Sequence, residues 1–122
     1  MSKAKEHLDK IMLELRRGTI TIGVLSQLKE PQYGYSLVKV LEEKGVNVEP
    51  GTLYPLLRRL EKQGLLVSKW DTDETRPRKY YLLSPLGEEV FDLVCKEWKE
   101  MTEVMEKLIS PRGDGGKTDG FD

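Results

Sequence analysis

The stretch Glu49–Leu66, EPGTLYPLLRRLEKQGLL, constrains the fold of this 122-residue chain more than any other. Leucines recur in it at the spacing of one helical face, and they are Leu53, Leu56, Leu57 and Leu60. Gly64 supplies the stop expected just past a helix, and the apolar residues after it begin a short strand, Leu66–Trp70. The pattern therefore predicts a helix that packs one face into a core and leaves the other in water.

The outer face of this predicted helix carries cations, a hydroxyl and a phenol. Its members are Thr52, Tyr54, Arg58, Arg59 and Lys62. Arginine can contact guanine O6 and N7 with two hydrogen bonds, and lysine, threonine and tyrosine can reach phosphates. Gly51, at the start of the helix, permits close approach of another backbone or a phosphate. Most amphipathic helices carry such residues only because they face water, so nucleic-acid binding and a plain solvated face both remain open on this segment alone.

The charge of the chain is balanced overall but divided locally. There are 20 basic and 21 acidic residues, and the pI near 5.9 argues against a protein that binds nucleic acid without specificity. Between Gly51 and Trp70 four basic residues oppose one acidic residue, whereas between Leu86 and Ile109 three basic residues oppose seven acidic ones. This division predicts a basic surface that reads a partner, followed by an acidic helix.

Several functional classes find no support in the composition. A single cysteine, Cys95, excludes an internal disulfide, and one histidine, His7, cannot build a cluster of soft metal ligands. The chain offers no nucleophile, histidine and carboxylate trio and no phosphate-binding glycine loop, so we expect no enzyme activity, metal or cofactor. No apolar run approaches the roughly 20 residues of a membrane span, and the charged N-terminus does not resemble a signal peptide. We therefore expect a cytoplasmic protein without a membrane partner.

Two helices are expected before the Glu49–Leu66 stretch. Residues 1–9 are charged and form either a loose N-terminal extension or a frayed helical lead. Apolar positions from Lys10 to Lys29 predict one long helix, which ends at Glu30 and Pro31 because the residue before proline is pushed out of helical conformation.

A second helix is predicted from Tyr33 to Lys44. Unpaired backbone amides and the helix dipole favour an anion at its N-terminal end. The side chains at this end belong to Tyr33, Tyr35, Ser36 and Lys39. A DNA phosphate fits there, but the two tyrosines would equally pack against the first helix, and both interpretations remain open.

Two short β-prone runs, Leu66–Trp70 and Lys79–Leu83, are joined by a charged loop and predict a hairpin. A hairpin that follows a helix-turn-helix is a wing. The cations of the wing, which can touch phosphates or the minor groove, are Arg76, Arg78 and Lys79. The acids of the wing would be repelled by DNA and are expected to turn outward, and these are Asp71, Asp73 and Glu74.

Ser84 caps the last predicted helix, residues 84–109, because Pro85 fits the first helical position and acidic residues follow in the early turns. Apolar residues in it repeat at steps of four and three, at Gly87, Phe91, Val94, Trp98, Met101, Met105 and Leu108. Such a heptad seam needs a partner, which predicts a homodimer with Phe91 and the later members of the seam at its interface. Residues 110–122 are rich in glycine and are expected to form a flexible tail.

The order of these elements resembles the PadR family of bacterial and archaeal transcriptional repressors. The similarity runs from about Leu15 to Ile109. The motifs that carry it are YGYSL at Tyr33–Leu37, GTLYPLLRRLEKQGLL at Gly51–Leu66 and RKYYLLSPLG at Arg78–Gly87. The single C-terminal helix is similar to that of the short subfamily. The expected fold class is thus mainly α with a small β-hairpin: a winged helix-turn-helix at residues 10–83 and a long C-terminal dimerisation helix.

The resemblance implies a homodimer that binds double-stranded DNA at a pseudo-palindromic operator. The helix around Thr52, Tyr54 and Arg58 would enter the major groove, with the Arg76–Lys79 wing beside it. The alternative is a winged-helix module that uses the same face to bind protein without touching DNA.

The resemblance also implies a small aromatic effector. In drug-responsive members of the family, a tryptophan from each C-terminal helix lines a central pore and stacks on flat aromatic ligands. Trp98, in CKEWKEM, matches that position. It would serve equally well as a large residue in a filled dimer core, and both roles remain open.

Overall fold

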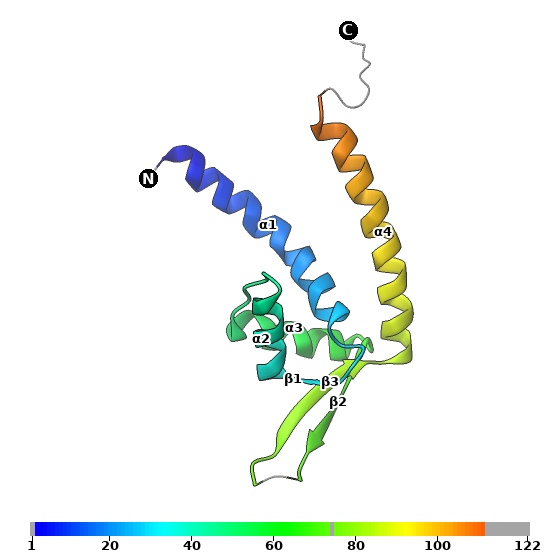
Figure 1. Cartoon of the computed structure of the whole chain (residues 1–122). Coiled ribbons are helices and arrows are strands. Elements are labelled where there is room, and N and C mark those ends of the chain that lie inside the picture. Colours follow the sequence, from blue (N-terminus) through cyan, green and yellow to red (C-terminus); the bar gives the residue numbers. More distant parts are fainter. Residues whose placement is uncertain (1, 74, 112–122) are drawn as a thin grey trace. The chain divides into compact units, whose positions relative to one another are not determined.

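The computed structural model describes residues 2–73 and 75–111, and within these ranges the chain forms four helices and three strands (Figure 1). In chain order they are α1 (Lys3–Ser26), β1 (Gln32–Tyr33), α2 (Gly34–Glu43), α3 (Pro50–Lys62), β2 (Leu66–Asp71), β3 (Arg78–Leu83) and α4 (Pro85–Ile109). The predicted fold class, mainly α with a small β-hairpin in a winged-helix arrangement, is confirmed. The chain divides into two compact units, which are Met1–Phe91 and Asp92–Asp122.

The core of the first unit lies between α1, α2, α3 and the sheet. The four leucines predicted as the buried stripe of α3 are all buried, and Leu53 and Leu57 are fully so. Gly64 follows α3 with φ of 84°, a left-handed conformation that favours glycine, and it ends the helix as predicted. The remaining buried apolar residues are Val24, Leu25, Leu28, Leu37, Leu41, Val48, Leu66, Tyr81, Leu83 and Phe91.

The sheet has three antiparallel strands in the order β1-β3-β2, so it is larger than the predicted hairpin. The hairpin strands pair from Leu66 opposite Leu83 to Asp71 opposite Arg78. The additional strand, β1, has only two residues and pairs Tyr33 with Tyr80. Two residues are too few to show the alternation by which a strand is recognised in sequence.

Helix α1 is longer at its start and shorter at its end than predicted. It begins at Lys3, which agrees with the helical alternative given for residues 1–9 and not with the loose one, and it ends at Ser26 instead of Lys29. The amide of Gln27 bonds to the carbonyl of Val24, which tightens the last turn. Beyond that turn, the carbonyl of Leu28 accepts a hydrogen bond from the amide of Leu83 at 2.8 Å. If α1 continued to Lys29, the Leu28 carbonyl would point along the helix axis. Because α1 ends at Ser26, this carbonyl is available to β3.

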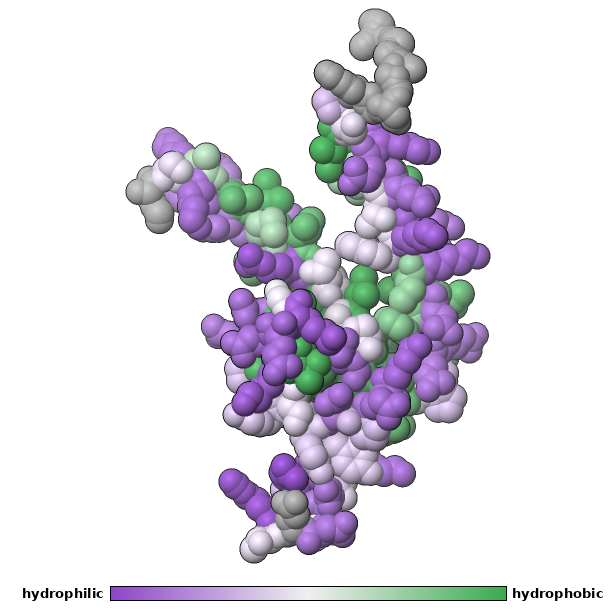
Figure 2. Space-filling view, in the orientation of Figure 1, coloured by the Kyte–Doolittle hydropathy of each residue, from purple (hydrophilic) through white to green (hydrophobic). Residues whose placement is uncertain are grey.

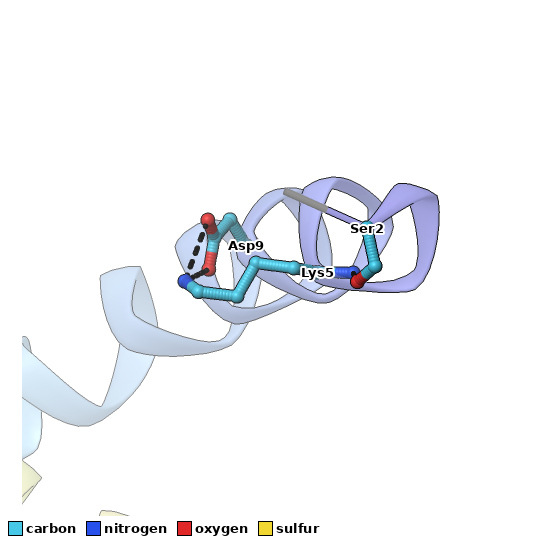
Figure 3. A network of polar contacts seen from close by, with 3 residues as sticks. All are labelled: Ser2, Lys5 and Asp9. Atoms are coloured by element: carbon cyan, nitrogen blue, oxygen red, sulfur yellow. Dashed lines mark hydrogen bonds and ion pairs between the residues drawn. The ribbon is translucent and has the colours of Figure 1, made fainter.

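The N-terminal turns of α1 are organised by local polar contacts (Figure 3). The side chain of Ser2 caps the helix by accepting a hydrogen bond from the Lys5 amide at 3.1 Å. One turn later the Lys5 ammonium pairs with the Asp9 carboxylate at 3.0 Å. Both contacts are exposed, so they support the helix locally without joining it to the core.

The N-terminal part of α1 carries exposed apolar side chains, and Figure 2 shows apolar surface along this helix. These residues are Leu8, Ile11, Leu13 and Leu15, and each is more than half exposed. Ile11 and Leu15 are among the apolar positions that predicted this helix, but only the C-terminal third of α1, with Val24 and Leu25, enters the core.

Ser84 fixes the start of α4, as predicted, and also ties it to the end of α3. Its side chain accepts a hydrogen bond from the Gly87 amide at 2.9 Å and donates one to the Gly64 carbonyl at 2.6 Å. Gly87 lies so close to Leu65 that an added Cβ would overlap the Leu65 carbonyl oxygen. The first unit, Met1–Phe91, includes the beginning of α4.

The second unit contains the rest of α4. The helix ends at Ile109, as predicted. Of the expected flexible tail, only Ser110 and Pro111 are described, and residues 112–122 lie outside the described part of the chain.

Candidate nucleic-acid interface

Helix α3 presents the cationic face that its sequence predicts. Arg58, Arg59 and Lys62 are exposed, because the neighbouring leucines turn the opposite face into the core. Arg59 and Lys62 occupy the last turn, where cations interact favourably with the helix dipole. Thr52 is also exposed, and a Cβ added at Gly51 would meet nothing within 4 Å, so the helix start has room beside its backbone.

Tyr54 differs from the other residues predicted for this face, because it is half-buried and packs against the core. Its ring lies against Gly34, the first residue of α2, and a Cβ added at Gly34 would overlap that ring. The prediction that Tyr54 falls off the packed stripe is therefore only partly right. Its position four residues before Arg58 on the helix still places it at the edge of the exposed face.

The N-terminal end of α2 brings together the four side chains expected there. Tyr35 is 68% exposed, and the Lys39 ammonium lies 5.5 Å from the centre of its ring. Ser36 is half-buried. The side chain of Tyr33, the N-cap residue, does not cap the helix. The amides of the first turn thus keep the capacity to bind an anion that the sequence indicated.

Tyr33 is engaged with the wing instead of with α1. Its hydroxyl donates a hydrogen bond to the Asp71 carboxylate at 2.5 Å, and the Arg78 guanidinium lies 4.1 Å from the centre of its ring. The Tyr33 and Tyr80 rings are nearly perpendicular in a T-shaped pair, at a centroid distance of 6.1 Å. Neither of the two predicted positions of Tyr33, on a phosphate or against the first helix, included this contact with the hairpin.

The expectation that all the wing acids turn outward is wrong for Asp71. This carboxylate is half-buried and accepts hydrogen bonds from the Tyr33 hydroxyl and from the Asp73 amide. The Tyr33 hydrogen bond, then the Asp73 amide, and the nearby Arg78 charge lower the pKa of Asp71 below its ordinary value of 3.8. Asp73 is exposed, as expected, and Glu74 lies outside the described residues.

Two open clefts flank the basic face of α3 where it meets the hairpin. One has a volume of about 590 Å³ and is lined by Arg58, Arg59, Glu61, Lys62 and Lys79. The other has a volume of about 440 Å³ and is lined by Tyr33, Gly34, Tyr35, Tyr54, Arg58, Trp70, Arg78, Lys79 and Tyr81. Predicted residues from α2, α3 and the wing are thus brought to one surface. Those that line neither cleft are Ser36, Lys39, Gly51, Thr52 and Arg76, and Arg76 lies exposed in the hairpin loop.

Four residues that line these clefts were not predicted there, namely Gly34, Glu61, Trp70 and Tyr81. Gly34 and Tyr81 are buried, whereas Trp70 and Glu61 reach the surface. Trp70 is 63% exposed on β2, opposite Lys79, and lines the aromatic cleft. Strand alternation places Trp70 on the same face as the buried Leu66, so the local pattern did not indicate its exposure. Glu61 lies among the cations of the other cleft. No sequence signal marks Glu61 either, since its partners come from the hairpin.

The predicted dimer residues of α4 do not share one environment. Phe91 is buried in the core of the first unit, with the Lys29 ammonium 5.5 Å from the centre of its ring. Its side chain therefore packs within its own chain, which departs from its predicted place at an interface. Val94 is half-buried, and the other members are exposed, namely Trp98, Met101, Met105 and Leu108.

Other kinds of site find no support in the described residues. No group of three or more histidine, cysteine, aspartate or glutamate side chains in them could hold a metal ion. His7 and Cys95 are both exposed and lie on different helices. None of the described helices combines the length and the apolar character needed to cross a bilayer.

Helices α2 and α3, followed by a hairpin beside the basic face of α3, define a winged helix-turn-helix protein. The chain belongs to the transcriptional regulator PadR-like family, whose family model matches residues 22–93. It is therefore a transcriptional regulator by family.

Similar proteins come from several bacteria. The transcriptional regulator Rv3488 of Mycobacterium tuberculosis is 38% identical over 77 residues, which cover 62% of this chain and 72% of that protein. A PadR family transcriptional regulator from Eggerthella lenta, known from a crystal structure, is 47% identical in sequence to this chain. The two structures match with a TM-score of 0.81 over 88% of this chain and 96% of that one. A PadR-like transcription factor from Bacteroides fragilis is 34% identical, with a TM-score of 0.69, over 81% of this chain and 98% of that one.

Proposed function

We propose that this regulator is a homodimeric repressor that binds double-stranded DNA at a pseudo-palindromic operator. The observation that carries the proposal is the exposed cationic face of α3, with Arg58, Arg59 and Lys62 standing beside Lys79 of the wing. If the cations of α3 served only to face water, there would be no reason for a second positively charged segment to lie beside them. Here the hairpin extends the basic face of α3.

The geometry suits a reading helix with supports on both sides. Helix α3 fits the major groove, where Arg58 can form two hydrogen bonds to a guanine. The uncapped first turn of α2 and the cations Arg76 and Arg78 of the wing can bind phosphates on either side of the groove. Tyr35, Lys39 and Thr52 are further exposed groups for the same backbone contacts.

DNA binding is tested by a gel shift on the DNA immediately upstream of the protein's own gene, at two salt concentrations and with excess competitor DNA. A discrete shift that survives competitor and weakens with salt, by about 0.9 in log K per log salt for each phosphate neutralised, supports the proposal. If no DNA is shifted, including DNA selected from random sequence, or if the salt response is flat, DNA binding is contradicted and the alternative of a protein-binding winged-helix module is favoured.

Arg58→Ala separates base reading from general charge. It should weaken operator binding by about 1 to 3 kcal/mol and relax the base preference at one position. Lys44→Ala is the matched control, because Lys44 is exposed at the opposite end of α2 and lines neither cleft. Unchanged base preference in Arg58→Ala would remove this residue from the readout.

The exposed seam of α4 supports a second copy of the chain as partner. Trp98, Met101 and Met105 repeat at steps of three and four on this helix, and 42%, 54% and 44% of their surfaces are exposed. A seam of this spacing buries its residues by pairing with an equivalent helix. Each protomer would then read one half-site, about one helical turn from the other.

Sedimentation of the full chain tests the dimer. The wild type should sediment as a dimer, and Met101→Glu should shift it toward the monomer because a charge would be buried in the seam. Glu100→Gln, one position away, is the control. A wild type that stays monomeric at high concentration would contradict the proposal.

Trp98 is the proposed contact for a flat aromatic effector. Titration with planar aromatic cations should quench its fluorescence if the ring stacks on them, helped by the neighbouring Glu97 and Glu100. Release of the operator by the same compound would make it an inducer. Absence of quenching by any of them would leave Trp98 as a packing residue of the dimer.

A further inference from the structure

One carboxylate lies among the cations of the cleft between α3 and the hairpin. Arg58, Arg59, Lys62 and Lys79 line this cleft together with Glu61. An acid on a surface that meets phosphates weakens their binding, so its presence there calls for a structural or functional reason.

The contacts of Glu61 join α3 to both strands of the wing. The Ser68 hydroxyl on β2 donates a hydrogen bond to Glu61 Oε2 at 2.5 Å. The Lys79 ammonium on β3 lies 3.8 Å from Glu61 Oε1, and it also lies 5.4 Å from the centre of the Tyr81 ring. Each carboxylate oxygen therefore has its own partner in the hairpin.

We infer that Glu61 is a positioning residue that holds the wing against α3 and competes with DNA phosphates for Lys79. The inference rests on the proposed DNA-binding function. In the free protein the Lys79 charge is partly neutralised by Glu61, and a phosphate that approaches Lys79 must share or displace this partner. Glu61 thereby lowers the affinity for any DNA backbone, so that tight binding depends more on base contacts made by α3.

Direct reading of a base is the other role open to a carboxylate, because cytosine offers its N4 amino group in the major groove. The observed contacts favour positioning, since both oxygens of Glu61 already interact with hairpin residues. A change of base preference on substitution is therefore the outcome that would reassign Glu61 to direct reading.

Glu61→Gln tests the inference, because the amide oxygen can still accept the Ser68 hydrogen bond while the charge is lost. Operator and non-operator DNA should both bind about two- to fivefold more tightly at low salt, the range expected for one exposed charge pair. The slope of log K against log salt should steepen by about one, because Lys79 is free to neutralise another phosphate. The preferred operator sequence should not change.

The same substitution in a Lys79→Met background shows whether Glu61 acts through Lys79. The gain from Glu61→Gln should then largely disappear. Glu43→Gln, which removes an exposed acid of α2 outside both clefts, should give a smaller gain that is the same in both backgrounds. A gain from Glu61→Gln that persists in full without Lys79 would overturn the inference.

Retention on heparin, a polyanion without base sequence, makes the test independent of the operator. Glu61→Gln should elute at higher salt than the wild type, and this difference should depend on Lys79. If the wild type and Glu61→Gln elute at the same salt concentration, the inference is wrong even if operator binding is established. The two ideas can also fail separately. If Glu61→Gln changes elution from heparin only when Lys79 is present, but the wild type binds no DNA, then Glu61 does compete for Lys79 and the proposed function is refuted.

Discussion

The hydroxyl of Tyr33 donates a hydrogen bond to the carboxylate of Asp71 across 38 residues of sequence. Tyr33 ends the short strand β1 just before α2, and Asp71 ends β2 in the hairpin. Arg78, directly opposite Asp71, lies over the ring of the same tyrosine. The loop end of the wing strands is therefore held by the segment that leads into the helix-turn-helix, while Glu61 joins the wing to α3.

Asp71 should make the stability of the protein depend on acid. Its pKa is lowered in the folded state, chiefly by the Tyr33 hydrogen bond, so its contribution is present above pH 3.8 and is lost as the pH falls through the lowered pKa. Asp71→Asn should therefore unfold more easily than the wild type near neutral pH, and the difference should narrow below pH 3.8. Urea unfolding at a series of pH values measures this difference in the free energy of unfolding. Tyr33→Phe, which removes the hydrogen bond to Asp71, should likewise make the free energy of unfolding depend less on acid pH. A constant difference at all pH values would argue against the hydrogen bond as its source.

The same glycine-to-alanine change should have opposite effects at two helical positions. Gly87→Ala should lower the free energy of unfolding by about 1 to 3 kcal/mol, because the new Cβ meets the Leu65 carbonyl, which is backbone and cannot turn away. Gly18→Ala should raise it by up to about 1 kcal/mol, because Gly18 is exposed within α1 and its added Cβ meets nothing within 4 Å. Urea unfolding curves compare the two, and equal effects would contradict the close approach at Gly87.

The helix caps Ser84 and Ser2 should contribute differently to the free energy of unfolding of the protein. Ser84 is 7% exposed and joins the first turn of α4 to the Gly64 carbonyl, so Ser84→Ala should cost about 1 to 3 kcal/mol. Ser2→Ala removes an exposed cap and should fray only the first turn of α1. Circular dichroism followed through thermal unfolding should show a lower midpoint for Ser84→Ala alone, and a comparable drop for Ser2→Ala would mean that the start of α1 belongs to the cooperative core.

The two tryptophans should report separately on the two proposed sites. In Trp98→Phe the remaining indole is that of Trp70, which lines the cleft at the wing, and its emission should change when operator DNA is added. In Trp70→Phe the remaining indole is that of Trp98, and its emission should respond to planar aromatic ligands more than to DNA. A response of Trp98 but not of Trp70 to operator DNA would place the DNA-binding surface away from the hairpin.

Features set by near neighbours in the chain were readable from the sequence. The leucine stripe and glycine stop of α3, the hairpin strands, and the Ser84 cap with Gly87 three residues later all depend on residues within a few positions of one another. The cations of the candidate interface were found for the same reason, because a helix that buries Leu57 and Leu60 on one face turns Arg58 and Arg59 between them to the other. The start of α1 was left undecided between a loose segment and a helical lead, since a charged segment gives no apolar period to follow, although Ser2 caps its first turn through the Lys5 amide.

The sequence by itself determined that this protein has an amphipathic basic helix, a following hairpin and a long apolar-seamed helix, because helical and strand periods are properties of the local backbone. Only the tertiary structure decided that Tyr54 is half-buried against Gly34, that Phe91 belongs to the protomer core, and that Asp71 and Glu61 turn toward the protein. Each of these depends on which distant segment lies opposite. A carboxylate faces water or a partner according to the donor that the fold brings within hydrogen-bonding distance, and local pattern carries no record of that donor.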